Sequence, residues 1–274
     1  MRLAISAIAW RKDEDSAVRD LLAAHGVTAI EAAPSKIGPK PLELSRDDLL
    51  RYRGFWAEKG IEIVAMQALL FGRADLAMFS TDAARDEMHE YLSRIIEIGG
   101  VLGAKALVFG SPGNRKRGEL SVAAADDIGA QFFRRAGEVA IRNSTCVCIE
   151  PNPPEYGCDW ITSVTQARAL VDRVGSAGFG LHIDAAAVHM AGETAGTIES
   201  NRGHIRHFHA SEPQLKALTS ESSVPHAEYG KTLRRIGGVP VVSIEMRQVE
   251  AEGSNLPHIE RALEFVASAY GTPR

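Results

Sequence analysis

Eight short apolar segments rich in β-branched residues recur along the chain, and longer segments with helical periodicity separate them. Several of the short segments are almost wholly hydrophobic, such as KALVF, VCIE and VVSIE, as expected of strands buried on both faces of a parallel sheet. This alternation of strand and helix predicts an α/β fold. The expected strands are Leu3–Ala9, Thr28–Ala32, Ile61–Met66, Ala104–Phe109, Thr145–Glu150, Phe179–Asp184, Ile205–His209 and Val239–Glu245.

Capping residues mark the ends of several expected helices. Ser45 and Thr81 are N-cap residue types followed by acidic side chains, which suit the helix dipole. Gly103 and Gly175 follow helical segments, where a left-handed C-cap favours glycine. The helix after the sixth strand is weakened by several glycines. The clearest helical segments are Asp13–Ala24, Ser45–Lys59, Thr81–Leu102, Ser121–Arg142, Ser163–Val174 and Pro257–Tyr270.

The number and size of the repeating units predict a barrel. Eight strand–helix units in 274 residues average about 34 residues each, close to a barrel of about 250 residues. No proline- or serine-rich linker interrupts the sequence. A doubly wound open sheet would need a glycine-rich phosphate turn after the first strand, where residues 9–13 read AWRKD. We therefore predict one (β/α)8 TIM barrel domain spanning residues 1–274.

Charge and composition restrict the class of partner. The net charge of −4 lacks the basic excess typical of nucleic-acid binding proteins. No apolar run approaches the roughly 20 residues of a membrane span, and the N-terminus lacks a signal-peptide pattern. Three cysteines, an odd number, favour a reducing compartment, with Cys146 and Cys148 as small buried hydrophobes. We expect a cytoplasmic enzyme that acts on small molecules, with neither nucleic acid nor membrane as its partner, and a homodimer is compatible with this expectation.

Four consecutive expected strands end on residue types that bind metals: Glu150, Asp184, His209 and Glu245. In a β/α barrel the carboxyl ends of the strands converge on the active site. A buried carboxylate is costly unless it is hydrogen-bonded, paired or bound to a cation, and a divalent cation would remove the repulsion among three of them. The alternative is that each acid forms a separate buried ion pair with an arginine.

Several motifs after the strands carry a resemblance to a known family. They are AIEAAPSKIG, VFGSPGNR, IEPNPPEYGCDW, LHIDAAAVH, HFHASEP and VSIEMR, in this order and at barrel spacing. Together they resemble the sugar phosphate isomerase/epimerase superfamily, the xylose isomerase-like TIM barrels that also include apurinic endonucleases. The resemblance covers nearly the whole chain. It implies one divalent metal held by Glu150, Asp184, His209 and Glu245.

The donor set predicts the chemistry of the site. Three carboxylates and one imidazole suit Mn²⁺, Mg²⁺ or Co²⁺, with Zn²⁺ possible. Such a metal acts as a Lewis acid and stabilises the enediolate formed when a carbon next to a carbonyl loses its proton. The resemblance to ketose 3-epimerases implies that Glu150 and Glu245 remove and return this proton on opposite faces. We predict a metal-dependent sugar (phosphate) isomerase or epimerase acting on a small sugar or keto-polyol.

Other side chains at the expected mouth are candidates for substrate binding. Glu31 and Gln67, at the ends of the second and third strands, have the chemistry to hydrogen-bond sugar hydroxyls. His189 and His226 resemble histidines near the mouth in relatives, although each is equally consistent with a plain loop histidine. Arg247, two residues beyond the last expected strand, is placed to contact substrate oxygens.

Further polar or aromatic residues have a structural interpretation beside the functional one. Trp10 is more consistent with a buried side chain than with a sugar-stacking ring. The basic cluster Arg115–Arg117 favours a solvated loop over a phosphate contact. His182 and His207 share strand parity with the expected ligands and are predicted to be satisfied histidines of the barrel core.

Four other functions are alternatives to an isomerase. A lyase like the inosose dehydratases would use the same proton abstraction followed by loss of a β-hydroxyl. A DNA-repair nuclease resembling the apurinic endonucleases would need histidines at strands two to four, where Glu31, Gln67 and Gly110 stand. A non-catalytic binding protein would have lost a ligand. A Schiff-base aldolase is disfavoured because Lys105 lies at the wrong end of its strand.

Overall fold

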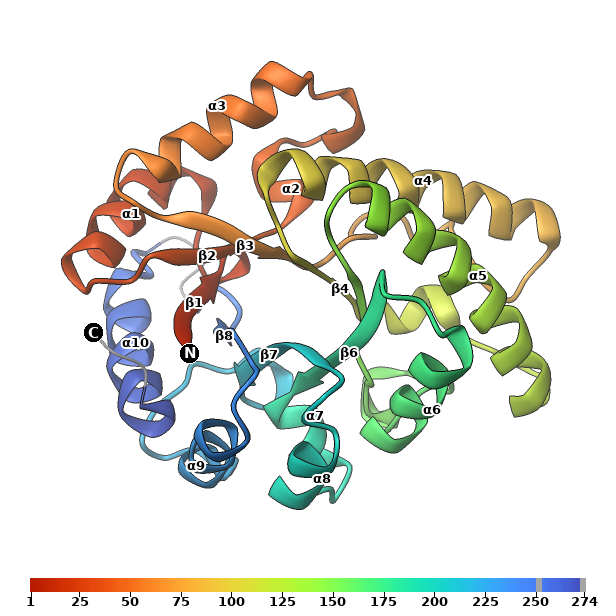
Figure 1. Ribbon diagram of the computed structural model, residues 1–274. Helices are drawn as coiled ribbons and strands as arrows, with labels where there is room; N and C mark the ends of the chain where they lie inside the picture. The colour runs from red at the N-terminus through yellow and green to blue at the C-terminus, as the bar shows by residue number, and fades with distance from the viewer. Residues whose placement is uncertain (250–252, 272–274) are drawn as a thin grey trace.

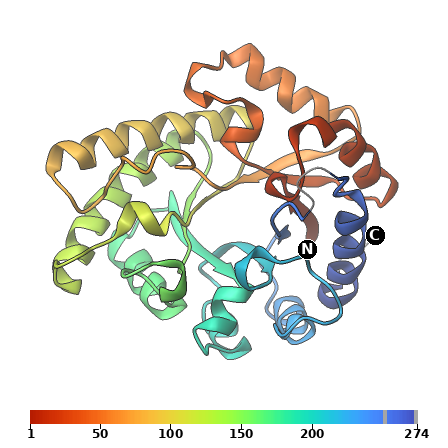
Figure 2. The same cartoon turned by 180° about the vertical axis from the view of Figure 1, so that it is seen from behind.

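Eight parallel strands form the centre of the structure, a computed structural model that describes residues 1–249 and 253–271. The strands pair in chain order, and β1 (Arg2–Ser6) pairs with β8 (Val241–Glu245), which closes the barrel. Helices surround the strands on the outside (Figure 1), and the view from behind shows the same ring (Figure 2). The predicted single-domain TIM barrel is confirmed.

The strands are short and mostly buried, and their ends differ from the expected ones by a few residues. Ser6 ends β1 because its hydroxyl accepts a hydrogen bond from the amide of Ile8 and caps a 3-10 helix, Ala7–Ala9. The seventh strand extends two residues beyond His209 to Ser211, which lies beside Glu245 in the register. The remaining strands are β2 (Ala29–Ala32), β3 (Glu62–Met66), β4 (Ala106–Phe109), β5 (Val147–Ile149), β6 (Phe179–Asp184) and β7 (Ile205–Ser211).

The helices follow the predicted segments closely, with Gly103 and Gly175 in left-handed C-caps. After β6 the glycine-weakened segment forms two short helices. None of the helices in the described ranges combines the length and apolarity needed to cross a membrane. The helices are α1 (Asp15–Ala24), α2 (Pro34–Ile37), α3 (Arg46–Ala57), α4 (Asp82–Leu102), α5 (Val122–Arg142), α6 (Val164–Val174), α7 (Ala185–Met190), α8 (Ala195–Ser200), α9 (His226–Ile236) and α10 (Leu256–Tyr270).

Large apolar side chains fill the space between the barrel and its helices. Trp10 is fully buried, packs edge-on against Trp56 with ring centroids 6.0 Å apart, and donates a hydrogen bond to Asp15 at 2.7 Å. Its expected structural role is therefore confirmed. All three cysteines are buried and free, as predicted for Cys146 and Cys148.

Candidate metal centre at the barrel mouth

Four side chains meet where four neighbouring strands end. Glu150 directly follows β5, Asp184 ends β6, His209 lies near the end of β7, and Glu245 ends β8. One donor atom from each lies within 4.8 Å of the others. Nδ1 of His209 lies 3.4 Å from Oε2 of Glu245 and 3.8 Å from Oε1 of Glu150. The structure thus brings together the four residues that the sequence singled out.

Hydrogen bonds fix the orientation of the Asp184 carboxylate. Its Oδ1 accepts a hydrogen bond from the Ala187 amide at 2.7 Å, so Asp184 also caps α7. Its Oδ2 accepts a hydrogen bond from the Ser211 hydroxyl. Sequence reasoning missed Ser211, although its parity with His209 on the same strand places both side chains on one face.

The buried carboxylate of Glu31 orients the His209 ring through its Nε2 atom. Oε2 of Glu31 lies 2.8 Å from Nε2 of His209 and accepts a hydrogen bond from Ser243 at 2.9 Å. Burial alone would raise the pKa of Glu31, but the neighbouring His209 and His207 hold it well below its usual range. Because Glu31 is fully buried, the expectation that it hydrogen-bonds a sugar hydroxyl needs correction. It holds the imidazole so that Nδ1 faces the other three ligands, as outer-shell carboxylates commonly do.

Gly110 and Arg115, which both follow β4, determine where Glu150 lies. A Cβ atom at Gly110 would overlap Oε2 of Glu150, so any larger residue there would force this carboxylate to move. Arg115 donates hydrogen bonds to the backbone carbonyl oxygens of Gly110 and Glu150, both at 2.7 Å, and of Trp160 at 2.6 Å. Arg115 is fully buried, so the expected solvated loop is wrong at this position. Nothing in the local sequence distinguished it from its exposed neighbour Lys116.

Without a bound cation, the carboxylates would repel one another. Burial, together with Glu245 and Asp184, raises the pKa of Glu150 to about 8. Burial and Glu245 raise the pKa of Asp184 to about 6. Burial would lower the pKa of His209, but Glu31 and Glu245 outweigh it and raise that pKa well above its ordinary value. The protein therefore holds these groups close together at an electrostatic cost.

A single divalent cation fits this arrangement. Nδ1 of His209 is buried and has no hydrogen-bond partner among the described residues, although three carboxylates surround it. A cation bound there would satisfy this nitrogen and remove the repulsion among the acids. The oxygen-rich donor set suits Mn²⁺, Mg²⁺ or Co²⁺, and Zn²⁺ also accepts these ligands.

Two cavities of about 240 and 330 Å³ lie above the ligands at the barrel mouth. Both are bounded by Ser111, Glu150, Leu215 and Glu245. The smaller one adds polar groups from Asn152, Tyr156 and Glu212, and the larger one adds Gln67 and the exposed ring of Phe71. Glu150 and Glu245 thus both line the same two cavities.

The predicted substrate contacts divide into two groups. Gln67 lines the larger cavity and donates a hydrogen bond to the Ser6 hydroxyl. His189 on α7 and Arg247 beyond β8 are exposed and line neither cavity, so their roles stay predictions.

His226 lies one layer behind the cavity wall. It is buried, and its Nε2 lies 2.8 Å from Oε1 of Glu212, which lines the smaller cavity. Its Nδ1 lies 2.7 Å from the Tyr270 hydroxyl. The prediction that His226 contacts substrate needs correction, because both ring nitrogens are occupied and the ring supports Glu212.

The two deeper histidines lie in the barrel core as expected. His182 and His207 are almost fully buried, with ring centroids 5.4 Å apart. They are not satisfied, however. Both nitrogens of His182 and Nε2 of His207 have no hydrogen-bond partner among the described residues.

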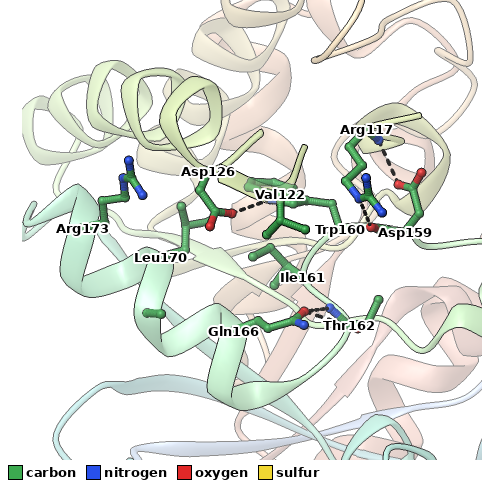
Figure 3. Close-up of a pocket in the computed structure, with 11 residues that line it drawn as sticks. Arg117, Val122, Asp126, Asp159, Trp160, Ile161, Thr162, Gln166, Leu170 and Arg173 are labelled. Atoms are coloured by element: carbon green, nitrogen blue, oxygen red, sulfur yellow. Dashed lines mark hydrogen bonds between the residues drawn. The ribbon is translucent and has the colours of Figure 1, made fainter. Parts of the chain in front are cut away.

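Another cavity, of about 300 Å³, lies outside the barrel between α5 and α6 (Figure 3). Its polar side chains bind one another or the nearby backbone, except that Arg173 binds the Asp127 side chain on α5. Trp160 donates to Asp126 at 2.8 Å, and the Arg117 amide donates to Asp159 at 2.8 Å. No potential metal ligands cluster there in the described part of the chain, so the barrel mouth is the stronger candidate.

The sequence matches one family of known proteins. The family described as "Xylose isomerase-like TIM barrel" matches residues 19–269. The chain belongs to this family. A comparison with curated proteins finds no significant match.

Solved structures resembling this family member include several sugar enzymes. L-ribulose 3-epimerase has a TM-score of 0.82 at 17% identity, covering 98% of this chain and 94% of the other. D-psicose 3-epimerase from Clostridium cellulolyticum H10, solved with D-tagatose, has a TM-score of 0.80 at 16% identity, covering 98% and 99%. The IOLI protein with a bound zinc atom has a TM-score of 0.79 at 17% identity, covering 99% and 98%. At these identities the likeness establishes the fold alone.

Proposed function

We propose that this protein is a metal-dependent sugar isomerase or epimerase that moves a proton at a carbon next to a carbonyl. The observation that carries the proposal is the cluster of Glu150, Asp184, His209 and Glu245 below two open cavities. A divalent metal bound there would supply the Lewis acidity that makes such a C–H bond acidic. The epimerases among the structural neighbours support this class of reaction, and the neighbour with a bound zinc atom supports a metal in this fold.

The two glutamates are the acid and base of this proposal. Glu150 follows β5 and Glu245 ends β8, so the two carboxylates reach the cavities from different sides of the barrel. One glutamate removes the substrate proton, and the other returns a proton from the opposite side, as general acid–base catalysis requires. Asp184 and His209 hold their positions through Ser211 and Glu31 and take no part in the proton transfer.

The cavity walls favour a neutral, unphosphorylated substrate. Among the described residues, no lysine, arginine or histidine lines either cavity. Phosphate recognition ordinarily uses such side chains, with arginine forming paired hydrogen bonds. The walls instead offer Asn152, Tyr156, Gln67 and Ser111, which suit the hydroxyl groups of a polyol. The same lack of cations disfavours the DNA-repair nuclease.

An assay in deuterated water tests the reaction. Unphosphorylated ketoses and inososes are incubated with the protein and Mn²⁺, Mg²⁺, Co²⁺ or Zn²⁺, and products are identified by mass spectrometry and NMR. We expect a stereoisomer or positional isomer that carries one solvent deuteron at the attacked carbon. A product lighter by one water would identify a lyase, and no product from the whole panel would contradict the proposal.

A substitution tests the role of Glu245. Glu245→Gln removes the acid–base group, so we expect turnover to fall at least about a hundredfold while the fold remains intact. Glu119→Gln, an exposed glutamate, is the matched control and should retain activity. Wild-type turnover in the Glu245→Gln protein would refute the role.

A further inference from the structure

We propose that the opposite, N-terminal end of the barrel binds an organic phosphate. A cavity of about 580 Å³ lies there, bounded by the first residues of several strands and by α3. This volume lies within the range of small-molecule sites in proteins. The site is separate from the metal centre, and its test does not depend on turnover.

Positive charge converges on this cavity. Arg2 on β1, Arg53 on α3, Lys105 just before β4 and Arg206 on β7 all line it, against one acid, Glu62. The chain as a whole carries a net charge of −4, so this concentration runs against the overall balance. Four cations brought together from different elements create a local potential that attracts an anion.

Three of the four cations lack an acidic partner. Arg2 forms an ion pair with Glu62 at 2.6 Å. In the described ranges no ion pair involves the other three. Arg53 and Lys105 make only long hydrogen bonds to backbone carbonyls, at 3.5 and 3.3 Å. The positive charges of Arg53, Lys105 and Arg206 are therefore available to a ligand.

A glycine makes room for one of the arginines. A Cβ atom at Gly180 on β6 would overlap Cγ of Arg206, so the glycine lets this side chain lie across the strand. The Arg206 side chain thus has a defined place beside the cavity.

The remaining wall is apolar and indicates an organic ligand. Ile61, Ile63 and Val241 are buried side chains that line the cavity between the cations. Guanidinium groups bind phosphate oxygens in pairs, and apolar walls accept the body of the molecule that carries the phosphate. A phosphate monoester of nucleotide size satisfies both features.

Isothermal titration of the manganese-loaded protein with adenosine monophosphate tests the site. We expect one molecule bound per chain, weaker binding at higher salt, and no binding of adenosine, which lacks the phosphate. Arg206→Gln and Lys105→Gln should each weaken binding about tenfold or more, as the loss of a charge-assisted hydrogen bond predicts. Arg168→Gln, on α6 and paired with Asp172, is the matched control and should bind like the wild type.

Three outcomes would overturn the proposal. They are no binding of adenosine monophosphate, equal binding of adenosine, or binding that neither Arg206→Gln nor Lys105→Gln weakens. The last would place the nucleotide elsewhere, for example at the metal centre. Thermal unfolding of each variant establishes that it is folded, and Lys105→Gln serves alone if Arg206→Gln fails to fold, because Lys105 is exposed.

Discussion

The carboxylate of Glu150 occupies the space that a side chain at position 110 would need. Gly110→Ala should therefore displace this ligand while leaving the other three in place. We expect affinity for Mn²⁺ to fall about 10- to 100-fold, the range for changes that disturb ligand orientation. Titration of the metal-free protein with Mn²⁺ measures the change.

A second glycine three residues further on provides the control for this prediction. A Cβ atom at Gly113 would meet no other atom within 4 Å. Gly113→Ala should consequently bind Mn²⁺ as the wild type does. Equal affinity in both variants would show that Gly110 does not create the place for Glu150.

At the scale of single residues, the four candidate ligands were predictable from the sequence, and the residues that support them were not. The rule that polar residues at strand ends converge was enough to select Glu150, Asp184, His209 and Glu245 as candidates. The supporting roles of Glu31 and Arg115 depend on contacts between residues far apart in the sequence. The local sequence does not indicate these contacts. Long side chains such as that of Arg115 reach several elements, so its burial could not be inferred from its polar neighbours.

At the scale of elements, hydrogen bonds from the Arg115 side chain connect the ends of β4 and β5 to the loop before α6. Arg115→Met would leave three backbone carbonyls without their donor, and buried unsatisfied groups are costly. We expect a loss of about 3 kcal/mol or more in the free energy of unfolding. Urea denaturation measures it.

A variant of the adjacent Lys116 distinguishes the effect of losing a positive charge from the effect of losing these hydrogen bonds. Lys116 is exposed, so Lys116→Met should change the unfolding free energy by less than about 0.5 kcal/mol. If Arg115→Met were no more destabilising than Lys116→Met, the hydrogen bonds of Arg115 would not hold these loops.

Element order and type were predictable, whereas several ends were not. The alternation of apolar and helical segments predicted all eight strands, because the strands of a buried parallel sheet are continuous hydrophobic runs. The end of β1 at Ser6 depends on a side-chain cap, and the end of β7 at Ser211 depends on pairing with β8. Both are decided by contacts that apolar periodicity does not encode.

For the whole molecule, crowding of acids at the mouth predicts a pH-dependent stability. The pKa of Glu150 rises from 4.5 to about 8 on folding, and that of Asp184 from 3.8 to about 6. A carboxyl group with a raised pKa stabilises the fold while it is protonated, and this contribution is lost as the pH rises through the folded-state value. The melting temperature of the metal-free protein should therefore fall between about pH 4 and pH 8.

Saturating Mn²⁺ and Glu150→Gln each provide a comparison for this pH dependence. The metal should raise the melting temperature most at pH 8, where the carboxylates are charged. Metal-free Glu150→Gln should lose less stability than the wild type over the same range. Parallel curves for the wild type and this variant would contradict the electrostatic account of the site.

Anomalous diffraction from a crystal soaked in manganese tests the central claim most directly, because it locates the ion independently of any assay. We expect one peak per chain at the barrel mouth, within about 2.0–2.6 Å of donor atoms from Glu150, Asp184, His209 and Glu245. Absence of an ion among these four side chains, with each acid paired to a separate cationic residue instead, would contradict the account.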